Sequence, residues 1–271
     1  MVENRLVRSL LSLGDSQLRQ AYAEDMLLRY DPALLADALD DLARLADAFD
    51  PRAREALLSV VAAMNQARCE ERVQRLREEA AGRGLGGLER LLRARAVPVG
   101  GVGGVTTVEE QDEARVPDYG AGRVLTLGER KSLARRPDRD MLERLLLDPH
   151  PDVIRRLLVN PRLTEELVVR LAARRPGSSA VLSELARAPR WAGRARVRLA
   201  LILNPSLPED IGVRLVSLLL RQELQLVLDR TPSDSPLHAL CAERLRAAPP
   251  RASVGALPGA RAPAIDPKLL N

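Results

Sequence analysis

Apolar residues recur at spacings of three and four along the first part of the chain. After Asp31-Pro32, positions 34, 35, 39, 42, 45, 46 and 49 are all apolar, which places them on one stripe of a helix. An Asp-Pro pair suits a helix start, because the carboxylate caps the first turn and the proline ring fits the first helical position. Asp50-Pro51 repeats the device before a second apolar segment. Residues 1–96 are therefore predicted to fold as a helical bundle or an antiparallel helical arm.

Glycine, proline and acidic residues interrupt this pattern. Residues 97–122 contain several Gly and Pro residues followed by five acids against one Arg, a composition typical of a flexible linker. Residues 250–271 are rich in Pro, Ala and Gly and are predicted to be a disordered tail. Gly82 to Gly87 spells G-x-G-x-x-G, but a charged helix precedes it where a dinucleotide site needs a strand. We interpret these glycines as a helix stop and turn.

A repeat lies between residues 123 and 249, where a leucine precedes a proline by four positions eight times. The prolines at 137, 149 and 161 are 12 residues apart, and those at 161, 205 and 249 are 44 apart. In keeping with the longer step, the segment from Asn160 to Leu171 aligns with the segment from Asn204 to Leu215.

The repeat has a physical interpretation. Proline disfavours the α region in the residue before it, so Asn160 and Asn204 are predicted to end helices. The leucine one turn before each proline is predicted to pack between successive layers. The acids at 165, 166, 209 and 210 are predicted to lie in the first turns of the next helices, facing the positive end of the helix dipole.

Internal repeats of about 40 to 47 residues are typical of helical solenoids. The run from Asp148 to Leu163, with its 12-residue proline steps, resembles the bacterial HEAT-like repeats and in particular the leucine-rich repeat variant. This resemblance implies a short α-solenoid over 123–249 and, for function, a surface that recognises a partner. Some proteins of the leucine-rich variant type carry an N-terminal iron–sulfur cluster held by cysteines. The chain has no cysteine cluster, so this feature is not carried over.

Composition points to the same fold class. The chain has 50 Leu, four Ile and only five aromatic residues. Strands favour β-branched and aromatic side chains, whereas Leu, Ala, Arg and Glu lose little rotamer freedom in a helix. The prediction is an all-α protein with four parts: helical residues 1–96, a Gly/Pro/acidic linker at 97–122, an α-solenoid at 123–249 and a disordered tail at 250–271.

The residue types that usually carry catalysis are scarce, with two His, two Cys and two Lys. Neither His150 nor His238 has a patterned partner for nucleophilic or metal chemistry, and the Pro-His-Pro run around His150 is typical of a helix start. The glycine loop of a phosphate-binding motif is absent before Lys131-Ser132. We therefore expect no catalytic residues, no metal and no cofactor, and predict that the protein is not an enzyme.

Three features favour a cytoplasmic protein. Cys69 and Cys241 are far apart in the sequence and fit buried thiols in a reducing compartment. No apolar run approaches the roughly 18 residues that span a bilayer, so membrane insertion is not expected. The charged N-terminal residues do not resemble a secretory signal.

The net charge of +5 is concentrated in the repeat, where residues 123–250 carry 23 basic and 15 acidic side chains. Residues 1–96 are balanced, with 15 basic and 16 acidic. A basic solenoid is expected to bind another protein through an acidic surface or segment, with binding to the phosphate backbone of nucleic acid as the alternative. A genomic preference for arginine, which makes up 40 of the 42 basic residues, would explain the same excess without a function.

The candidate partner-binding residues are eight arginines of the repeat: Arg155, Arg156, Arg170, Arg174, Arg175, Arg194, Arg198 and Arg214. All of them except Arg194 and Arg198 recur at equivalent repeat positions, which predicts that they line one surface. The alternate spacing at 194, 196 and 198 instead spreads these arginines around a helix. Trp191, in the most arginine-rich part of this region, is predicted to be a packing residue between repeats because no other aromatic residue accompanies it as a base-stacking surface.

Overall fold

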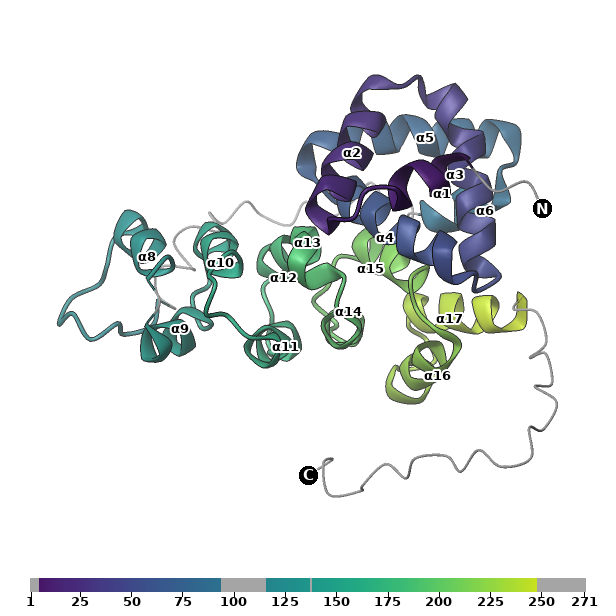
Figure 1. Ribbon diagram of the computed structural model, residues 1–271. Coiled ribbons are helices and arrows are strands. Elements are labelled where there is room, and N and C mark those ends of the chain that lie inside the picture. The colour runs from purple at the N-terminus through teal and green to yellow at the C-terminus, as the bar shows by residue number, and fades with distance from the viewer. Residues whose placement is uncertain (1–4, 94–115, 137, 248–271) are drawn as a thin grey trace, which may run out of the picture.

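The computed structural model describes residues 5–93, 116–136 and 138–247, which fold into helices with no strand among them. The all-α prediction is confirmed for these residues. Helices α1 (Arg5–Leu11) to α6 (Gly86–Leu91) form an N-terminal block, and helices α8 (Leu127–Leu133) to α17 (Pro236–Ala247) form an array of two rows (Figure 1). The predicted tail at 250–271 and most of the predicted linker at 97–122 lie outside the described residues.

Two helices of the N-terminal block, α3 (Pro32–Asp47) and α4 (Pro51–Met64), begin where the sequence predicts. The side chains of Asp31 and Asp50 accept hydrogen bonds from the first turns of α3 and α4, and a proline opens each helix. Gly84 ends α5 with φ of +64°, which confirms the helix stop. Gly87 lets α6 approach α3 closely, because a Cβ atom there would lie 2.8 Å from the carbonyl oxygen of Asp40. The helices of the block are α1 (Arg5–Leu11), α2 (Ser16–Arg29), α3 (Pro32–Asp47), α4 (Pro51–Met64), the 3-10 helix η1 (Ala67–Cys69), α5 (Glu70–Arg83) and α6 (Gly86–Leu91).

The array places its short helices in two rows that alternate along the chain, except that the successive helices α12 and α13 both lie in the upper row (Figure 1). Contacts within a row join α8 to α10, α10 to α12, α11 to α14 and α14 to α16. The upper row contains α8 (Leu127–Leu133), α10 (Pro151–Leu158), α12 (Ser179–Arg187), α13 (Pro189–Ala192) and α15 (Glu209–Val216). The lower row contains α9 (Arg139–Leu145), α11 (Glu165–Ala173), α14 (Ala195–Ile202) and α16 (Arg221–Arg230). The last helix, α17 (Pro236–Ala247), packs against α15 and α16.

Most leucines that precede a proline by four residues pack inside the array. Four of them are fully buried and three are half-buried, the fully buried ones being Leu145, Leu157, Leu185 and Leu201. Leu147 is the exception, with 48% of its surface exposed, so the prediction that it packs between layers is wrong. Because Leu145 and Leu147 are only two residues apart at the end of α9, they point to different sides, and Leu145 takes the inner side.

Two asparagines give the 44-residue repeat its physical basis. As predicted, Asn160 and Asn204 follow the ends of α10 and α14, and acids open the helices that come next. The side-chain amide of Asn160 donates to two backbone carbonyls at the end of α8, at 2.8 and 3.0 Å. Asn204 donates in the same way at the end of α11, also at 2.8 and 3.0 Å. Each asparagine therefore satisfies carbonyl groups of the preceding helix in its own row.

The two copies of the repeat lie in opposite rows, which corrects a sequence prediction. α10 is in the upper row and α14 is in the lower row, because α12 and the four-residue α13 together take one place in the upper row (Figure 1). Residues 44 positions apart therefore face different surroundings. The recurring arginines do not line one surface.

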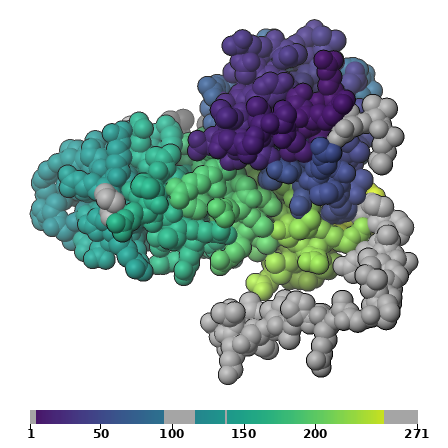
Figure 2. All heavy atoms as spheres, viewed as in Figure 1, coloured from purple at the N-terminus to yellow at the C-terminus, as the bar shows by residue number. Residues whose placement is uncertain are grey.

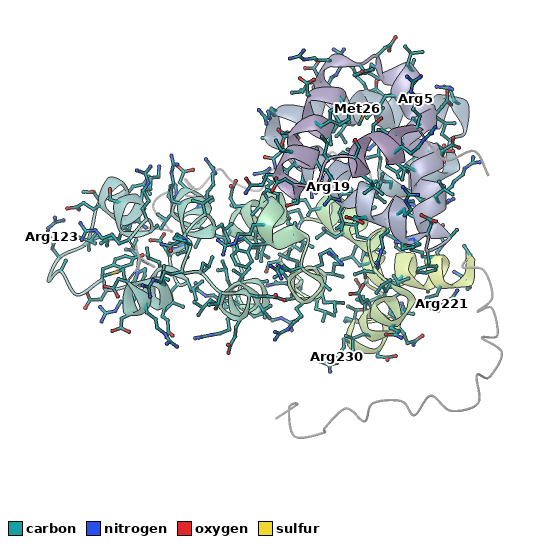
Figure 3. The ribbon with its side chains drawn as sticks, viewed as in Figure 1. Arg5, Arg19, Met26, Arg123, Arg221 and Arg230 are labelled. Carbon is teal, nitrogen blue, oxygen red and sulfur yellow. The ribbon has the colours of Figure 1, made fainter. Side chains whose placement is uncertain are left out.

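The N-terminal block covers the C-terminal half of the array, and α8 to α11 project beyond it (Figure 2). α2 and α4 contact α13, and α6 contacts α15. Arg244 of α17 donates to the carbonyl oxygen of Ala46 at 2.9 Å and to that of Val216 at 2.5 Å, which ties the block to the array. The guanidinium of Arg221 lies 5.2 Å from the centre of the Phe49 ring, at the end of the array opposite Arg123 (Figure 3). Buried apolar residues of both parts form one continuous core.

The end of the predicted linker, residues 116–122, is held against the array by Tyr119. The buried hydroxyl of Tyr119 donates to Asp148 at 2.5 Å, and Arg130 donates to both oxygens of the same carboxylate at 2.9 Å. Asp148 occupies the position 12 residues before Asn160. Among the described residues, no array helix of this row precedes α9. At this position a carboxylate accepts hydrogen bonds from Tyr119 and Arg130, whereas the asparagines donate to carbonyls.

Removing either asparagine amide leaves two buried carbonyls without a donor. Asn160→Ala and Asn204→Ala are each expected to lower the free energy of unfolding by about 2 kcal/mol, measured by urea denaturation with circular dichroism. Gln222→Ala, an exposed amide on α16 with no side-chain hydrogen bond among the described residues, is the control and should change it by less than about 0.5 kcal/mol. Unchanged stability in both asparagine variants would contradict this role.

Tyr119 makes the free energy of unfolding change with pH in the alkaline range. Burial, followed by the hydrogen bond to Asp148, raises the pKa of Tyr119 well above its ordinary value of 10.0. Above pH 10 the unfolded chain loses this proton while the folded chain keeps it, so the free energy of unfolding falls as pH rises. Tyr119→Phe is expected to cost about 1 kcal/mol at neutral pH and to lose stability less steeply above about pH 10. Urea denaturation at several alkaline pH values measures both effects; equal slopes for the two proteins would refute them.

Candidate partner-binding groove

The structure divides the eight candidate arginines into three groups. Three lie together in a groove of the lower row, three stand elsewhere on the surface of the array, and two are buried. In that order, they are Arg170, Arg174 and Arg175; Arg155, Arg156 and Arg194; and Arg198 and Arg214.

The two buried arginines are not available to a partner, so the prediction is wrong for them. Arg198 is 5% exposed and donates to the carbonyl oxygen of Gly193 at 2.7 Å. Arg214 is also 5% exposed and donates to the side-chain oxygen of Asn65 at 2.7 Å and to Asp210 at 2.5 Å. Burial lowers the pKa of both guanidinium groups. Arg214 is buried because α15 lies beneath the N-terminal block, where it meets the end of α4.

Two of the three surface arginines outside the groove are held by acids. Arg155 donates to Glu184 at 2.7 Å, and this hydrogen bond raises the pKa of Arg155. Arg194 lies 3.6 Å from a carboxylate oxygen of Glu165. Arg156 is exposed on α10 and has no side-chain partner within the described ranges. These side chains belong to separate parts of the surface and do not form one site.

The groove lies between the C-terminal ends of α9 and α11 and has a volume of about 690 Å³. Four guanidinium groups and one carboxylate line it, together with four apolar residues. The lining residues are Glu143, Arg144, Leu146, Leu147, Arg170, Leu171, Ala173, Arg174 and Arg175. Arg144 was not among the candidates predicted from the sequence.

Backbone carbonyls, and not acids, hold three of the four groove arginines. Arg174 donates to the carbonyl oxygen of Leu146 at 3.4 Å, and Arg175 donates to that of Leu203 at 2.6 Å. Arg144 donates to the carbonyl oxygen of Asp118 at 3.3 Å. Among the described residues, none of the four groove arginines forms a salt bridge. Since each guanidinium has five N–H donors, most donors and the positive charge remain for a ligand.

Apolar surface accompanies this charge. Leu146 and Leu171 line the groove but are buried in the array, whereas Leu147 is the leucine whose exposure departs from the repeat pattern. A groove with guanidinium groups beside an accessible leucine offers both ionic and apolar contacts. The leucine–proline spacing gave no signal of this, because it predicts burial for Leu147 and for Leu145 alike.

Other candidate chemistry has structural roles. The Trp191 indole is 2% exposed and donates to the carbonyl oxygen of Leu158 at 2.7 Å, so it packs between neighbouring helices as predicted. The Nδ1 atom of His150 accepts from the backbone N–H of Asp152 at 3.1 Å, which confirms the helix-start interpretation. Cys69 and Cys241 are buried free thiols, as expected, and burial raises the pKa of Cys241 to about 12.

In the described part of the chain, no group of three or more His, Cys, Asp or Glu is placed to hold a metal ion. In the same residues, no helix has the length and apolar character needed to cross a bilayer. Comparison of the chain with protein-family models, curated proteins and solved structures gives no match. A ligand for the groove is therefore inferred from the residues that line it.

Arg170 and Arg214 occupy equivalent positions in the repeat, but truncation is expected to destabilise the protein only at Arg214. Arg214→Ala leaves the buried Asn65 oxygen without a donor and should lower the free energy of unfolding by about 2–3 kcal/mol. Arg170→Ala removes an exposed side chain and should change it by less than about 0.5 kcal/mol. Urea denaturation of the two variants provides a matched comparison. Equal losses of stability in the two variants would contradict the difference in burial between Arg170 and Arg214.

Proposed function

We propose that the protein is a non-catalytic interaction scaffold in which α8 to α17 form an α-solenoid of the HEAT-like, leucine-rich variant type. In this proposal the N-terminal block is a helical bundle joined to the solenoid by the linker, and the groove between α9 and α11 binds an acidic segment of another protein. One observation carries the binding proposal: four arginines line one groove and no carboxylate of the described residues pairs with them.

The arrangement of the helices supports the solenoid assignment. Short helices alternate between two rows, and each row buries leucines against its neighbours. The equivalent hydrogen bonds of Asn160 and Asn204 recur 44 residues apart, within the range typical of helical repeats. Solenoids of this kind present extended surfaces to partners, and this favours recognition over catalysis.

The chemistry of the groove favours a carboxylate ligand. Guanidinium groups form paired, planar hydrogen bonds with carboxylates, and these are stronger than hydrogen bonds between neutral groups. Arg174 and Arg175 are already positioned by backbone carbonyls, so binding costs them less conformational freedom. The exposed position of the groove means that salt will weaken the interaction.

Nucleic-acid binding is the alternative, and the charge distribution favours it less. A phosphate backbone needs a continuous positive track, whereas Arg155 and Arg194 are paired with acids and Arg198 is buried. Trp191 is also buried, which removes the one indole that could stack on a base. A cytoplasmic location fits the proposal, because Cys69 and Cys241 are free thiols.

Charge reversal in the groove tests the proposed function. Arg170→Glu combined with Arg174→Glu should weaken binding of a fluorescent poly-glutamate peptide at least about tenfold, measured by fluorescence anisotropy. Binding by the unaltered protein should weaken as NaCl is raised from about 50 to 300 mM.

The control for this experiment carries the same charge change elsewhere. Arg196→Glu alters an exposed arginine of α14 that lies outside the groove, and Arg156→Glu does the same on α10; together they match the double reversal. The control protein should bind the peptide within about twofold of the unaltered protein. Equal loss of binding in the two double variants would mean that net charge, and not the groove, attracts the peptide.

A further inference from the structure

The groove contains an exposed apolar side chain that does not contribute to charge attraction. Leu147 is 48% exposed beside four guanidinium groups, and it continues the apolar surface of Leu146 and Leu171 out to the solvent. Resting on the proposed function, we infer that the groove selects an amphipathic acidic segment, in which a leucine-like side chain lies between carboxylates, over a uniform polyanion.

Leu147 provides the apolar half of this recognition. It is the one exposed member among the leucines of the leucine–proline pattern, and it lies two residues after the end of α9, where the groove opens. Leu146 and Leu171 beneath it belong to the buried core. An apolar side chain of a ligand would therefore be received by a fixed surface and would cover the exposed leucine.

The positions of the four guanidinium groups determine where the carboxylates of the ligand bind. Arg144 belongs to α9, whereas Arg170 belongs to α11 and Arg174 and Arg175 follow that helix, so guanidinium groups come from both sides of the groove. A segment with carboxylates on both sides of one apolar residue matches this arrangement. It can place the apolar side chain on Leu147 while its carboxylates reach arginines of both helices.

Glu143 opposes a uniform polyanion. Its carboxylate lines the same groove and pairs with no basic side chain among the described residues. A continuous row of phosphates would meet this like charge and would gain nothing from Leu147. A peptide can avoid Glu143 by placing an uncharged residue beside it, which a nucleic-acid backbone cannot do.

Three probes separate charge from amphipathic recognition. They are a fluorescent peptide of repeating Glu-Glu-Leu, its match with each Leu replaced by Ser, and a single-stranded oligonucleotide of similar charge. We expect the Leu peptide to bind the full chain about tenfold more tightly than the Ser peptide. Leu147→Ser should remove this difference and leave binding of the Ser peptide unchanged.

Leu226→Ser is the matched control, because Leu226 is 37% exposed on α16 and does not line the groove. This variant should keep the tenfold preference for the Leu peptide. Glu143→Gln should improve oligonucleotide binding by about threefold or more, with a smaller effect on the Leu peptide. Thermal denaturation verifies that each variant is folded.

The outcomes distinguish this inference from the proposed function. Equal binding of the Leu and Ser peptides would overturn amphipathic selection and leave the acidic-segment scaffold standing. Tight binding of the oligonucleotide with no binding of either peptide would overturn both. A Leu147→Ser protein that loses affinity for both peptides to the same degree would also overturn the inference, since Leu147 would then act on the structure of the groove and not on the apolar residue.

Discussion

The array depends on side chains that satisfy the last carbonyl groups of neighbouring helices. An α-helix leaves about four C-terminal carbonyls without internal donors. In helices of only seven to nine residues, such as α8 to α11, these carbonyls are a large share of all the backbone acceptors. Asn160 and Asn204 donate to such carbonyls through their amides, Trp191 does so through its indole, and Arg244 through its guanidinium. The same bonds fix the spacing between helices of a row, so the leucine core and the backbone hydrogen bonds are completed together.

Hydrogen bonds to carbonyls give part of the arginine excess a structural role. Several arginines act as long internal donors: Arg187 reaches the carbonyl at the end of α4, and Arg244 joins both parts of the chain. A count of basic residues therefore overstates the charge offered to partners. In the groove, Arg144, Arg174 and Arg175 donate to carbonyls, which hold a guanidinium in place without neutralising it as an acid would.

Local signals in the sequence predicted much of the fold. Asp31-Pro32 and Asp50-Pro51 start helices, and asparagines before prolines end them, because capping and proline geometry act within one turn of the chain. The groove could not be predicted from such local signals. Whether an arginine is buried depends on its row and on whether the N-terminal block covers it, and both follow from contacts distant in sequence. Arg170 and Arg214 have the same local sequence pattern and opposite exposure for this reason.

The projection of α8 to α11 beyond the N-terminal block has a consequence for the dynamics of the protein. In a stacked array each layer is stabilised mainly by its nearest neighbours, so the uncovered layers can open without unfolding of the covered ones. Protection of backbone amides from hydrogen exchange should then fall from α14 toward α8. A molecule seated between α9 and α11 would raise protection in this segment alone, which makes the free end the part of the protein whose order responds to binding.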